Sequence, residues 1–345
     1  MPADSEPRGP VASFDEIRRV LAEFPSADLE AATAAMVHDR DLTKPAGSLG
    51  RLEELVVWLA SWQAAYPPRL RHPRTAVFAG NHGVAARGVS AYPANVTAQM
   101  VANFSNGGAA VNQLCRLVDA DLRVYEMALD DPTQDFTQGP AMDEEECAHA
   151  IAYGMMAVEP GLDVLCLGEM GIGNTTSGAA LCLALFGGEA ADWVGPGTGV
   201  AGADLERKRS VVAEAVAFHK AQCRDPLDWL AAVGGRELAA IVGAVTAARL
   251  ARVPVLLDGF TCTAAAAVLY AMDKTALDHC QVAHRSAEPG HDRLLAHIGK
   301  RPLLDLGMRL GEASGATLAV SLLNAALACH TGMATFSGAG VSGPV

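Results

Sequence analysis

Residues 165–180, LCLGEMGIGNTTSGAA, predict a strand, a glycine turn and the start of a helix in direct succession. The run 162–167 that leads in is almost wholly apolar, as in a strand that is covered on both faces. Gly168, Gly171 and Gly173 then let the backbone turn sharply and come close to a ligand. Free N–H groups at a helix start attract anions, and the polar residues NTTS stand at that point. The stretch therefore predicts a phosphate site on a strand–turn–helix unit.

Composition and charge limit the function classes that the chain can serve. Its 345 residues are 50% hydrophobic and 19% charged, which suffices for a sizeable core in one large domain or two. The net charge of −13 argues against nucleic acid or an anionic membrane as a partner. The same charge opposes an anionic substrate. A phosphate site in this chain must therefore be locally basic, through backbone N–H groups and a few Lys or Arg side chains.

Neither the start of the chain nor its apolar runs predict secretion or a membrane span. Met1–Pro10 carries acidic residues and prolines and has no apolar signal region. The most apolar runs, 238–260 and 313–329, are interrupted by arginines or by polar residues. The eight cysteines are scattered without a CxxC pair, mostly in apolar surroundings. We therefore expect reduced core cysteines in a cytoplasmic protein.

Strands alternate with helical segments throughout residues 75–290. Five strands are predicted, at 75–80, 122–127, 162–167, 253–257 and 280–283. This alternation predicts a parallel α/β sheet with right-handed crossovers. The helical segments outside that range, near 14–40 and 302–328, have no strand partners. We expect these helices to pack together as a smaller lobe.

Several predicted strands end in glycine-rich or polar loops, at 80–83, 168–177, 195–199 and 258–259. Ligands of open parallel sheets bind beyond the carboxyl ends of the strands, so the set predicts a nucleotide or phosphosugar pocket. Any one loop could still be an ordinary tight turn, because GxxGxG at 168–173 is neither the dinucleotide fingerprint nor a P-loop. The loop 44–51, with a lysine, an arginine and two glycines, is either an anion clamp or a plain helix start.

Glu312 stands among small and apolar residues, in LGMRLGEASG (306–315), on the long helix predicted over 302–328. Glycines on both sides remove side-chain bulk and could admit a flat ligand. A buried carboxylate has a raised pKa, which suits a general base near neutral pH. The alternative is a plain helix salt bridge with Arg309.

Six segments carry a family resemblance: KPAGSLGRLE (44–53), NHGV (81–84), GEMGIGNTT (168–176), VLLDGF (255–260), SAE (286–288) and MRLGEASGA (308–316). In this order, from about residue 42 to 330, they resemble the nicotinate-nucleotide–dimethylbenzimidazole phosphoribosyltransferases. The resemblance implies a homodimer with an α/β fold: a Rossmann-like parallel sheet flanked by helices in three layers, with a small helical domain formed from both termini. We expect the large domain over 66–304 and the small one over 1–65 and 305–345.

The resemblance also implies a reaction. The family moves the 5-phosphoribosyl group from nicotinate mononucleotide to 5,6-dimethylbenzimidazole with inversion, giving α-ribazole 5′-phosphate and nicotinate for the nucleotide loop of cobalamin. The partners are small molecules, and no cofactor is implied. The donor's pyridinium nitrogen is already positive, so the ring leaves neutral without metal activation. No metal site is expected, because no carboxylate pair or histidine motif has obvious ligand spacing.

Site residues are likewise implied by the matching motifs. Glu312 is expected to be the general base that takes the acceptor's N–H proton. The expected phosphate and nucleotide contacts are Glu169, Gly171, Gly173, Asn174 and Thr175, and the further substrate contacts are Lys208 and Ser286. The expected ligand wall consists of Tyr92, Met100 and Leu310. Tyr92 and Met100 replace a serine and a glutamine of the enteric members, which favours a different benzimidazole or another flat base.

Two other functions stay open. A nicotinamide-dependent oxidoreductase would explain the glycine turns and an acid at Glu189 or Asp192, close to where a ribose-binding residue is expected. The GxGxxG fingerprint of that class is absent, however. A non-catalytic sensor of a nucleotide or base could keep the same fold and pocket. Binding without product formation would distinguish the sensor from an enzyme.

Overall fold

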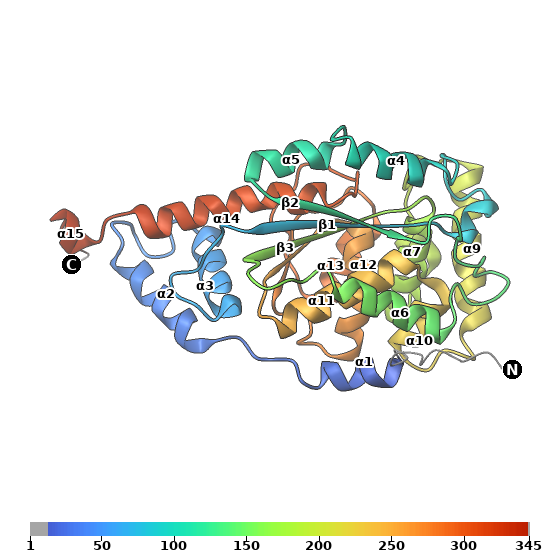
Figure 1. Cartoon of the computed structure of the whole chain (residues 1–345), viewed down its shortest axis with the longest axis horizontal. Helices are drawn as coiled ribbons and strands as arrows, with labels where there is room; N and C mark the ends of the chain where they lie inside the picture. The colour runs from blue at the N-terminus through green and yellow to red at the C-terminus, as the bar shows by residue number, and fades with distance from the viewer. Residues whose placement is uncertain (1–12, 344–345) are drawn as a thin grey trace, which may run out of the picture.

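The computed structural model describes residues 13–343, which are built around one five-stranded sheet (Figure 1). The strands are β1 (Pro73–Gly80), β2 (Asp121–Met127), β3 (Val164–Met170), β4 (Val255–Leu257) and β5 (Cys280–Val282). Their order is β2-β1-β3-β4-β5, and every pair is parallel. The five predicted strands and the parallel α/β sheet are thus confirmed. The expectation for Met1–Pro10 falls outside the described residues.

Helices cover both faces of the sheet. One face carries α6 (Glu144–Met155), α7 (Asn174–Phe186), α8 (Ala190–Trp193), α9 (Ala203–His219), α10 (Pro226–Val233), α11 (Arg236–Leu250), α12 (Phe260–Met272) and α13 (Gly290–Ile298). The other face carries α3 (Arg51–Gln63), α4 (Val96–Ser105), α5 (Ala110–Val118) and α14 (Ser314–Gly332). A short 3₁₀ helix, η1, spans Gly83–Arg87.

Alternate residues of the central strands supply two separate cores. Leu165 and Leu167 of β3 belong to the core with α6, α7, α11 and α12, whereas Val164 and Cys166 belong to the core with α3, α5 and α14. All four side chains are fully buried. Because successive side chains of a strand point to opposite faces, an unbroken apolar run is what a sheet covered on both sides requires. The strand covered on both faces, which that run predicted, and the three-layer arrangement, which the resemblance implied, are therefore confirmed.

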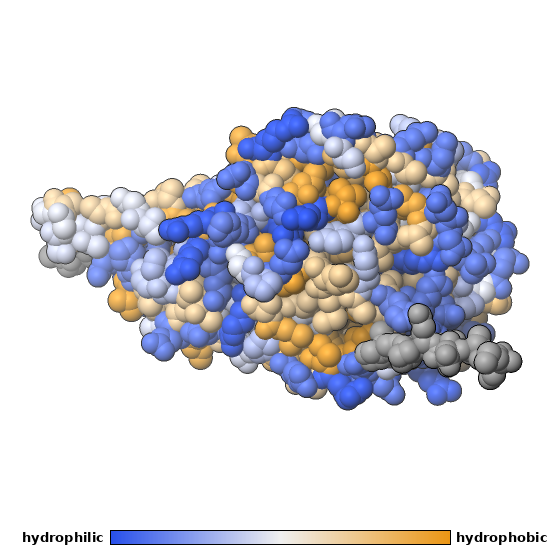
Figure 2. All heavy atoms as spheres, viewed as in Figure 1, coloured by the Kyte–Doolittle hydropathy of each residue, from blue (hydrophilic) through white to orange (hydrophobic). Residues whose placement is uncertain are grey.

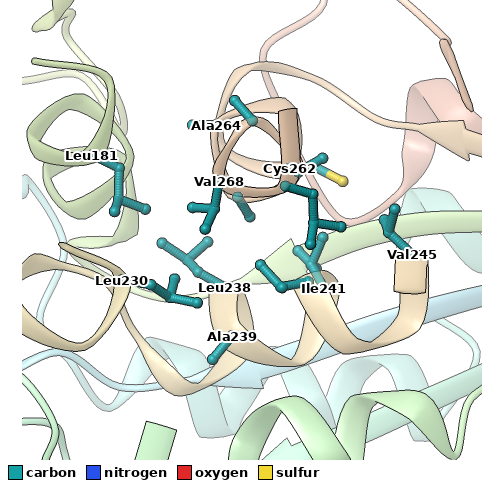
Figure 3. Close-up of a cluster of buried hydrophobic side chains, with 14 of the residues drawn as sticks. Leu181, Leu230, Leu238, Ala239, Ile241, Val245, Cys262, Ala264 and Val268 are labelled. Atoms are coloured by element: carbon teal, nitrogen blue, oxygen red, sulfur yellow. The ribbon is translucent and has the colours of Figure 1, made fainter. Parts of the chain in front are cut away.

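Within the first core, α11 packs against α6, α10 and α12. Figure 3 shows Leu238 and Ile241 of α11 facing side chains of α12, with Leu181 of α7 and Leu230 of α10 close by. On its far side α11 crosses α6 so closely that a Cβ added at Gly154 would lie 1.9 Å from the carbonyl oxygen of Ala240. Glycine is therefore required where α6 and α11 cross.

The predicted helix over 302–328 is wrong over residues 302–313, because α14 begins only at Ser314. Residues 303 and 304 instead continue the sheet edge: the Leu303 N–H donates to the Val282 oxygen and the Leu304 N–H to the Ala283 oxygen, both at 2.9 Å. Positive φ angles at Gly307, Gly311 and Glu312 also exclude a helix there. Glu312 consequently lies in the turn that precedes α14.

The predicted helical segment 14–40 forms two helices that pack in different places. α2 (Leu29–Asp41) packs on α3, and α3 packs on α14, which gives the projecting lobe in Figure 1. α15 (Phe336–Ala339) lies at the end of that lobe. α1 (Phe14–Leu21) instead packs against α6. The proposed division at 1–65, 66–304 and 305–345 stays a prediction.

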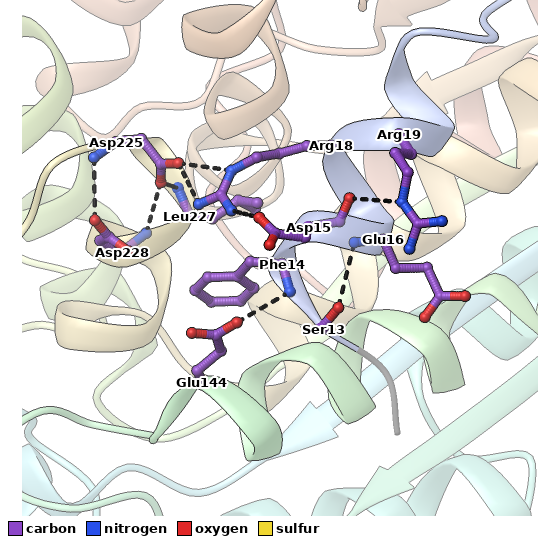
Figure 4. Close-up of polar contacts among 10 residues, drawn as sticks. All are labelled: Ser13, Phe14, Asp15, Glu16, Arg18, Arg19, Glu144, Asp225, Leu227 and Asp228. Atoms are coloured by element: carbon purple, nitrogen blue, oxygen red, sulfur yellow. Dashed lines mark hydrogen bonds and ion pairs between the residues drawn. The ribbon is translucent and has the colours of Figure 1, made fainter. Parts of the chain in front are cut away.

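Polar contacts fasten α1 to the main body. Its first N–H, from Phe14, donates to Glu144 Oε1 at 3.2 Å, and Arg18 Nε donates to Asp225 Oδ2 at 3.0 Å (Figure 4). Phe14 itself is buried in the first core. The N-terminal helix therefore links α6 to the start of α10.

Hydrophobic and hydrophilic residues are interspersed on the face of the molecule that Figure 2 shows. Within residues 13–343, every helix falls short of the length and apolar character that a bilayer crossing needs. α2 nevertheless exposes three large apolar side chains on the lobe, Leu29, Met36 and Val37. This is the densest group of exposed apolar side chains on a single described helix.

Candidate active site

A cavity of about 530 Å³ lies at the carboxyl edge of the sheet. Its walls come from α4 and the loop before it, the β3–α7 turn, the loop 197–198, the start of α12, the loop after β5 and the turn before α14. The predicted site residues that line it are Tyr92, Met100, Glu169, Gly171, Asn174, Thr175, Ser286, Leu310 and Glu312. Lys208 and Gly173 stand directly behind this lining. One cavity therefore gathers segments that are up to 220 residues apart, from Tyr92 to Glu312.

The β3–α7 turn has the conformation that its glycines allow. Gly173 has φ +99° and caps α7, which begins at Asn174 as predicted. A Cβ at Gly171 would lie 2.6 Å from the Gly80 oxygen and 3.3 Å from His82 Nε2, so no larger residue fits without a shift. The amino end of a 13-residue helix is thereby directed at the cavity. Such a helix end favours a bound anion.

Lys208 of α9 brings an ammonium group to the β3–α7 turn. It is 1% exposed, and its Nζ donates to Thr175 Oγ1 at 2.8 Å and to the Gly195 oxygen at 3.1 Å. Burial lowers the pKa of this lysine to about 8, against the opposing effect of the Glu288 carboxylate. The ammonium group thus supports the β3–α7 turn from behind, through its hydrogen bond to Thr175, which itself lines the cavity.

Glu312 is 5% exposed and faces the cavity from a turn in which its own φ is +63°. Its N–H donates to the backbone oxygen of Glu169 at 3.0 Å, which ties the turn to the end of β3. Burial, followed by the negative charge of Asp258, raises the pKa of the Glu312 carboxyl to about 7. A group with that pKa can exchange a proton near neutral pH.

The alternative pairing of Glu312 with Arg309 is wrong. Arg309 has another partner among the described residues, because its Nη1 donates to the Gly197 oxygen at 2.8 Å. Glu288 Oε1 accepts the Gly197 N–H at 2.9 Å, so a cation and an anion hold this loop together. Burial raises the pKa of Glu288, although Lys208, the Gly197 N–H and Arg309 oppose that rise.

Glu169 is a second buried carboxyl on the same wall. Its side chain accepts a hydrogen bond from the Asn174 amide, across the β3–α7 turn. Burial, then the negative charges of Asp258 and Glu237, raise its pKa well above the usual value, and the Asn174 bond offsets only part of that rise. Glu169 is consequently a good candidate for a neutral carboxyl that donates a hydrogen bond to a substrate oxygen.

Tyr92, Met100 and Leu310 form an apolar wall together with Val96 and Phe260. Tyr92 and Leu310 are more than half exposed, at 55% and 56%. The loop that carries Tyr92 is attached to the loop 195–199, because Thr198 Oγ1 accepts the Ala91 N–H at 3.0 Å. This hydrogen bond therefore connects the loop that carries Tyr92 to the loop 195–199 on the cavity wall.

Several polar side chains at the site were not predicted individually. They are Asp258 after β4, His284 and Glu288 after β5, and Arg309 in the turn before α14. The sequence marked their loops as polar strand ends, but spacing alone does not say which side chain turns inward. Ser286 lines the cavity, and its N–H donates to His291 Nδ1 at 2.8 Å.

His82 joins a buried network behind the β3–α7 turn. Its Nε2 lies 2.6 Å from Glu237 Oε1, and its Nδ1 lies 3.0 Å from Ser177 Oγ. The geometry is that of a nucleophile, base and acid, but Ser177 is 0% exposed in the structure. No substrate can reach this serine, so the network holds the turn in place rather than attacking a substrate.

The loop 44–51 is a helix start with internally satisfied charges. Lys44 Nζ pairs with Asp39 and with Glu53, each at 2.8 Å, and is buried. Arg51 donates to the Pro302 oxygen and lies away from the cavity lining. Of the two interpretations of this loop, the plain helix start fits the structure.

Within residues 13–343, no group of three or more His, Cys, Asp or Glu side chains could hold a metal ion.

Comparison with known proteins gives concordant results. The model of a family described as "Phosphoribosyltransferase" matches residues 24–341. A nicotinate-nucleotide–dimethylbenzimidazole phosphoribosyltransferase of Brucella anthropi is 56% identical over 330 residues, which cover 96% of this chain and 97% of that protein. The Brucella canis protein of the same name is 56% identical over 329 residues, which cover 95% of this chain and 97% of that protein.

The solved structures agree with these relatives. CobT from Thermus thermophilus superposes with a TM-score of 0.85 at 43% identity, covering 91% of this chain and 100% of that one. A second structure, of the nicotinate-nucleotide–dimethylbenzimidazole phosphoribosyltransferase from the same organism, has a TM-score of 0.84 at 40% identity. It covers 92% of this chain and 100% of that chain. Fold and sequence thus indicate the same family.

Proposed function

Since this chain belongs to the nicotinate-nucleotide–dimethylbenzimidazole phosphoribosyltransferase family, we propose that its reaction takes place in the cavity at the carboxyl edge of the sheet. The enzyme transfers the phosphoribosyl group of nicotinate mononucleotide to 5,6-dimethylbenzimidazole or a related base, in the synthesis of the cobalamin lower ligand. The oxidoreductase and the non-catalytic sensor are not favoured.

The donor's phosphate is proposed to bind at the amino end of α7. Gly171, Gly173, Asn174 and Thr175 form that end, and Lys208 lies directly behind Thr175 at 2.8 Å. Backbone N–H groups, the helix dipole and a buried ammonium together provide the local positive potential that a chain of net charge −13 needs there. Arg309, whose guanidinium holds Gly197, adds a second cation on this side.

The acceptor base is proposed to lie against the apolar wall of Tyr92, Met100 and Leu310. This places its ring nitrogen within the cavity that Glu312 also faces. Attack on the anomeric carbon from the side opposite the pyridinium inverts that carbon, and the bond's electron pair stays on the nicotinate nitrogen. Glu169 and Ser286, both on the cavity lining, are proposed to contact the nucleotide.

The observation that carries this assignment is the position of Glu312. The new bond leaves the acceptor's second nitrogen with a proton that has to be removed. Glu312 is the cavity carboxyl whose pKa is raised to about 7, so it is available as a base at neutral pH. Its backbone is fixed to the end of β3, which keeps the carboxylate in place during the reaction.

A product assay tests the proposal. Purified protein, nicotinate mononucleotide and 5,6-dimethylbenzimidazole are incubated with a chelator, and products are identified by mass and by the anomeric NMR coupling. We expect α-ribazole 5′-phosphate and nicotinate. Binding of both substrates by calorimetry without any product would instead support the sensor.

We expect Glu312→Gln to lower kcat by about 10²–10⁴-fold, because the amide cannot take the proton. Glu214→Gln serves as the matched control, since Glu214 is an exposed carboxylate on α9. Both variants are assayed at saturating substrate and checked by thermal unfolding. A Glu312→Gln protein with the turnover of the Glu214→Gln control would show that Glu312 is not the base.

The assembly and location are also proposals. We propose a homodimer, with the exposed apolar side chains of α2 as part of its contact surface. We also propose a cytoplasmic location, which is supported by eight cysteines that are all free thiols. No nucleic acid partner is proposed, in keeping with the acidic net charge.

A further inference from the structure

Asp258 is a buried carboxylate whose negative charge acts on the proposed base. It follows β4 directly and is 0% exposed. Its Oδ1 accepts the backbone N–H of Ala316 at 3.0 Å, and its Oδ2 has no hydrogen-bond partner among the residues that the structure describes. Ala316 lies in the first turn of α14, four residues after Glu312. Asp258 therefore holds the helix start whose preceding turn carries Glu312.

His284 faces both Asp258 and the cavity. It is 1% exposed, and its Nε2 lies 3.4 Å from Asp258 Oδ1. Neither ring nitrogen has a hydrogen-bond partner within residues 13–343. Buried polar groups are rarely left in this state, so an unsatisfied imidazole on a cavity wall calls for a functional reason.

Two glycines form the slot that holds the His284 ring. A Cβ at Gly315 would lie 2.0 Å from His284 Cδ2, and a Cβ at Gly259 would lie 2.9 Å from Nε2. Any side chain at Gly315 would displace the imidazole. The ring is thus held against Asp258 by the same turn of α14 that follows Glu312, so its position is built into the site.

The ionisable groups around Glu312 differ in what they contact. Arg309 and Glu288 are both bonded to Gly197 on the phosphate side, and Glu169 is bonded to Asn174. Asp258 is the charged neighbour that raises the pKa of Glu312, after burial itself, and it also raises the pKa of Glu169. Burial opposes a charged His284, but the adjacent Asp258 carboxylate outweighs it, so that the His284 pKa is raised.

We propose that Asp258 and His284 form a positioning pair that acts through Glu312. Asp258 holds the turn of Glu312 and supplies a negative charge that makes Glu312 a stronger base, and His284 offsets part of that charge. The proposal rests on the proposed role of Glu312. In each turnover the acceptor's N–H bond breaks, a Glu312 O–H bond forms, and the proton passes to water before the next cycle. A neighbouring anion favours the protonated product of that step.

Asp258→Asn tests the charge while keeping the shape. The amide oxygen can still accept the Ala316 N–H, so the start of α14 is retained. Because Glu312 loses an anionic neighbour, we expect the acid limb of the kcat–pH profile to move down by about one pH unit. We also expect the plateau kcat to fall severalfold, since a weaker base takes the proton, and the KM for nicotinate mononucleotide to stay unchanged.

His284→Gln gives the opposite expectation. Loss of the partly compensating cation leaves Asp258 more negative toward Glu312, so the acid limb moves up. Asp273→Asn, at an exposed position after α12, is the control and leaves the limb in place. If the two substitutions only made the site less rigid, kcat would fall in both variants, but the acid limbs of their kcat–pH profiles would not move in opposite directions.

Four outcomes decide the matter, with each variant's fold checked by circular dichroism. If the acid limb of the kcat–pH profile moves down in Asp258→Asn and up in His284→Gln, the result supports the pair. If both limbs stay at the wild-type pH while Glu312→Gln is inactive, the result overturns the pair and leaves Glu312 as the base. If Asp258→Asn does not fold, the direction of the His284→Gln limb decides alone, and a downward or absent shift overturns the proposal. A fully active Glu312→Gln would refute the proposed base itself.

Discussion

Lys208 illustrates how a single residue of this site is placed at the expense of stability. Its ammonium is almost fully buried, and its hydrogen bonds go to the neutral oxygens of Thr175 and Gly195. Burial lowers its pKa to about 8, although Glu288 opposes this. A depressed lysine pKa means that the charged form is less favourable in the folded protein than in the unfolded chain. An anionic ligand at the β3–α7 turn would relieve that cost.

Lys208→Met is therefore expected to separate binding from stability. The folded protein releases this proton near pH 8 and the unfolded chain near pH 10.5. The unfolded state binds more protons in that window, so the contribution of Lys208 to stability rises with pH there, by about 3 kcal/mol in all. Urea unfolding of the wild type should show this rise, and the variant should lack it.

The same variant should bind the donor poorly. We expect its KM for nicotinate mononucleotide to increase by about tenfold or more, because the positive charge behind the β3–α7 turn is lost. Lys220→Met, at an exposed site at the end of α9, is the control and should change neither property. An unaltered KM in Lys208→Met would argue against the phosphate site.

At the scale of elements, the β3–α7 turn depends on supports from three other segments. His82 follows β1, Glu237 begins α11, and Ser177 lies in the first turns of α7. Their hydrogen bonds, of 2.6 and 3.0 Å, pass directly behind Gly171. The Ile172 N–H donates to Thr97 Oγ1 of α4 at 3.2 Å, which secures the turn from the other side. The anion site is thus held by rigid elements.

Gly171→Ala should disturb this turn specifically. The added Cβ would meet the Gly80 backbone oxygen at 2.6 Å, and neither backbone can yield without shifting the turn. We expect a stability loss of about 1–3 kcal/mol and a marked rise in the KM for nicotinate mononucleotide. Gly139→Ala is the matched control, since a Cβ there meets nothing within 4 Å. Equal behaviour of the two variants in donor titrations would contradict the proposed placement of the phosphate.

At the scale of the whole molecule, the lobe of α2, α3 and the outer half of α14 projects from the sheet (Figure 1). Leu29, Met36 and Val37 on α2 are 77%, 42% and 54% exposed. Apolar groups gathered on one helix commonly mark a contact surface. The proposed homodimer would cover them.

Val37→Lys should weaken that dimer, because a charge would be buried in an apolar contact. Light scattering after size-exclusion chromatography is expected to give a dimer for the wild type and a larger monomer fraction for the variant. Phe218→Lys, at a half-exposed position on α9, is the control and should remain dimeric. A wild type that is monomeric at all concentrations would refute the homodimer.

Sequence patterns predicted the sheet well and the residues beyond it less well. The strand run 162–167 and the helix start at Asn174 were found because burial on both faces and a glycine turn leave local signatures. The helix over 302–328 was predicted too long, because apolar composition does not show that residues 303 and 304 pair with the end of β5. The prediction therefore put Glu312 in a helix, whereas the residue lies in a turn that lines the cavity.

The sequence by itself determined the family, the parallel sheet and most of the cavity lining, since these depend on periodicity and on motifs that are contiguous along the chain. Only the tertiary structure decided the partners of each charge. Arg309 binds Gly197 rather than Glu312, and Asp258 and His284 meet beside the proposed base. These contacts join strand ends and loops that are distant in sequence, and the side-chain directions at a strand end depend on backbone angles such as φ +63° at Glu312. No local pattern encodes such angles, because packing imposes them.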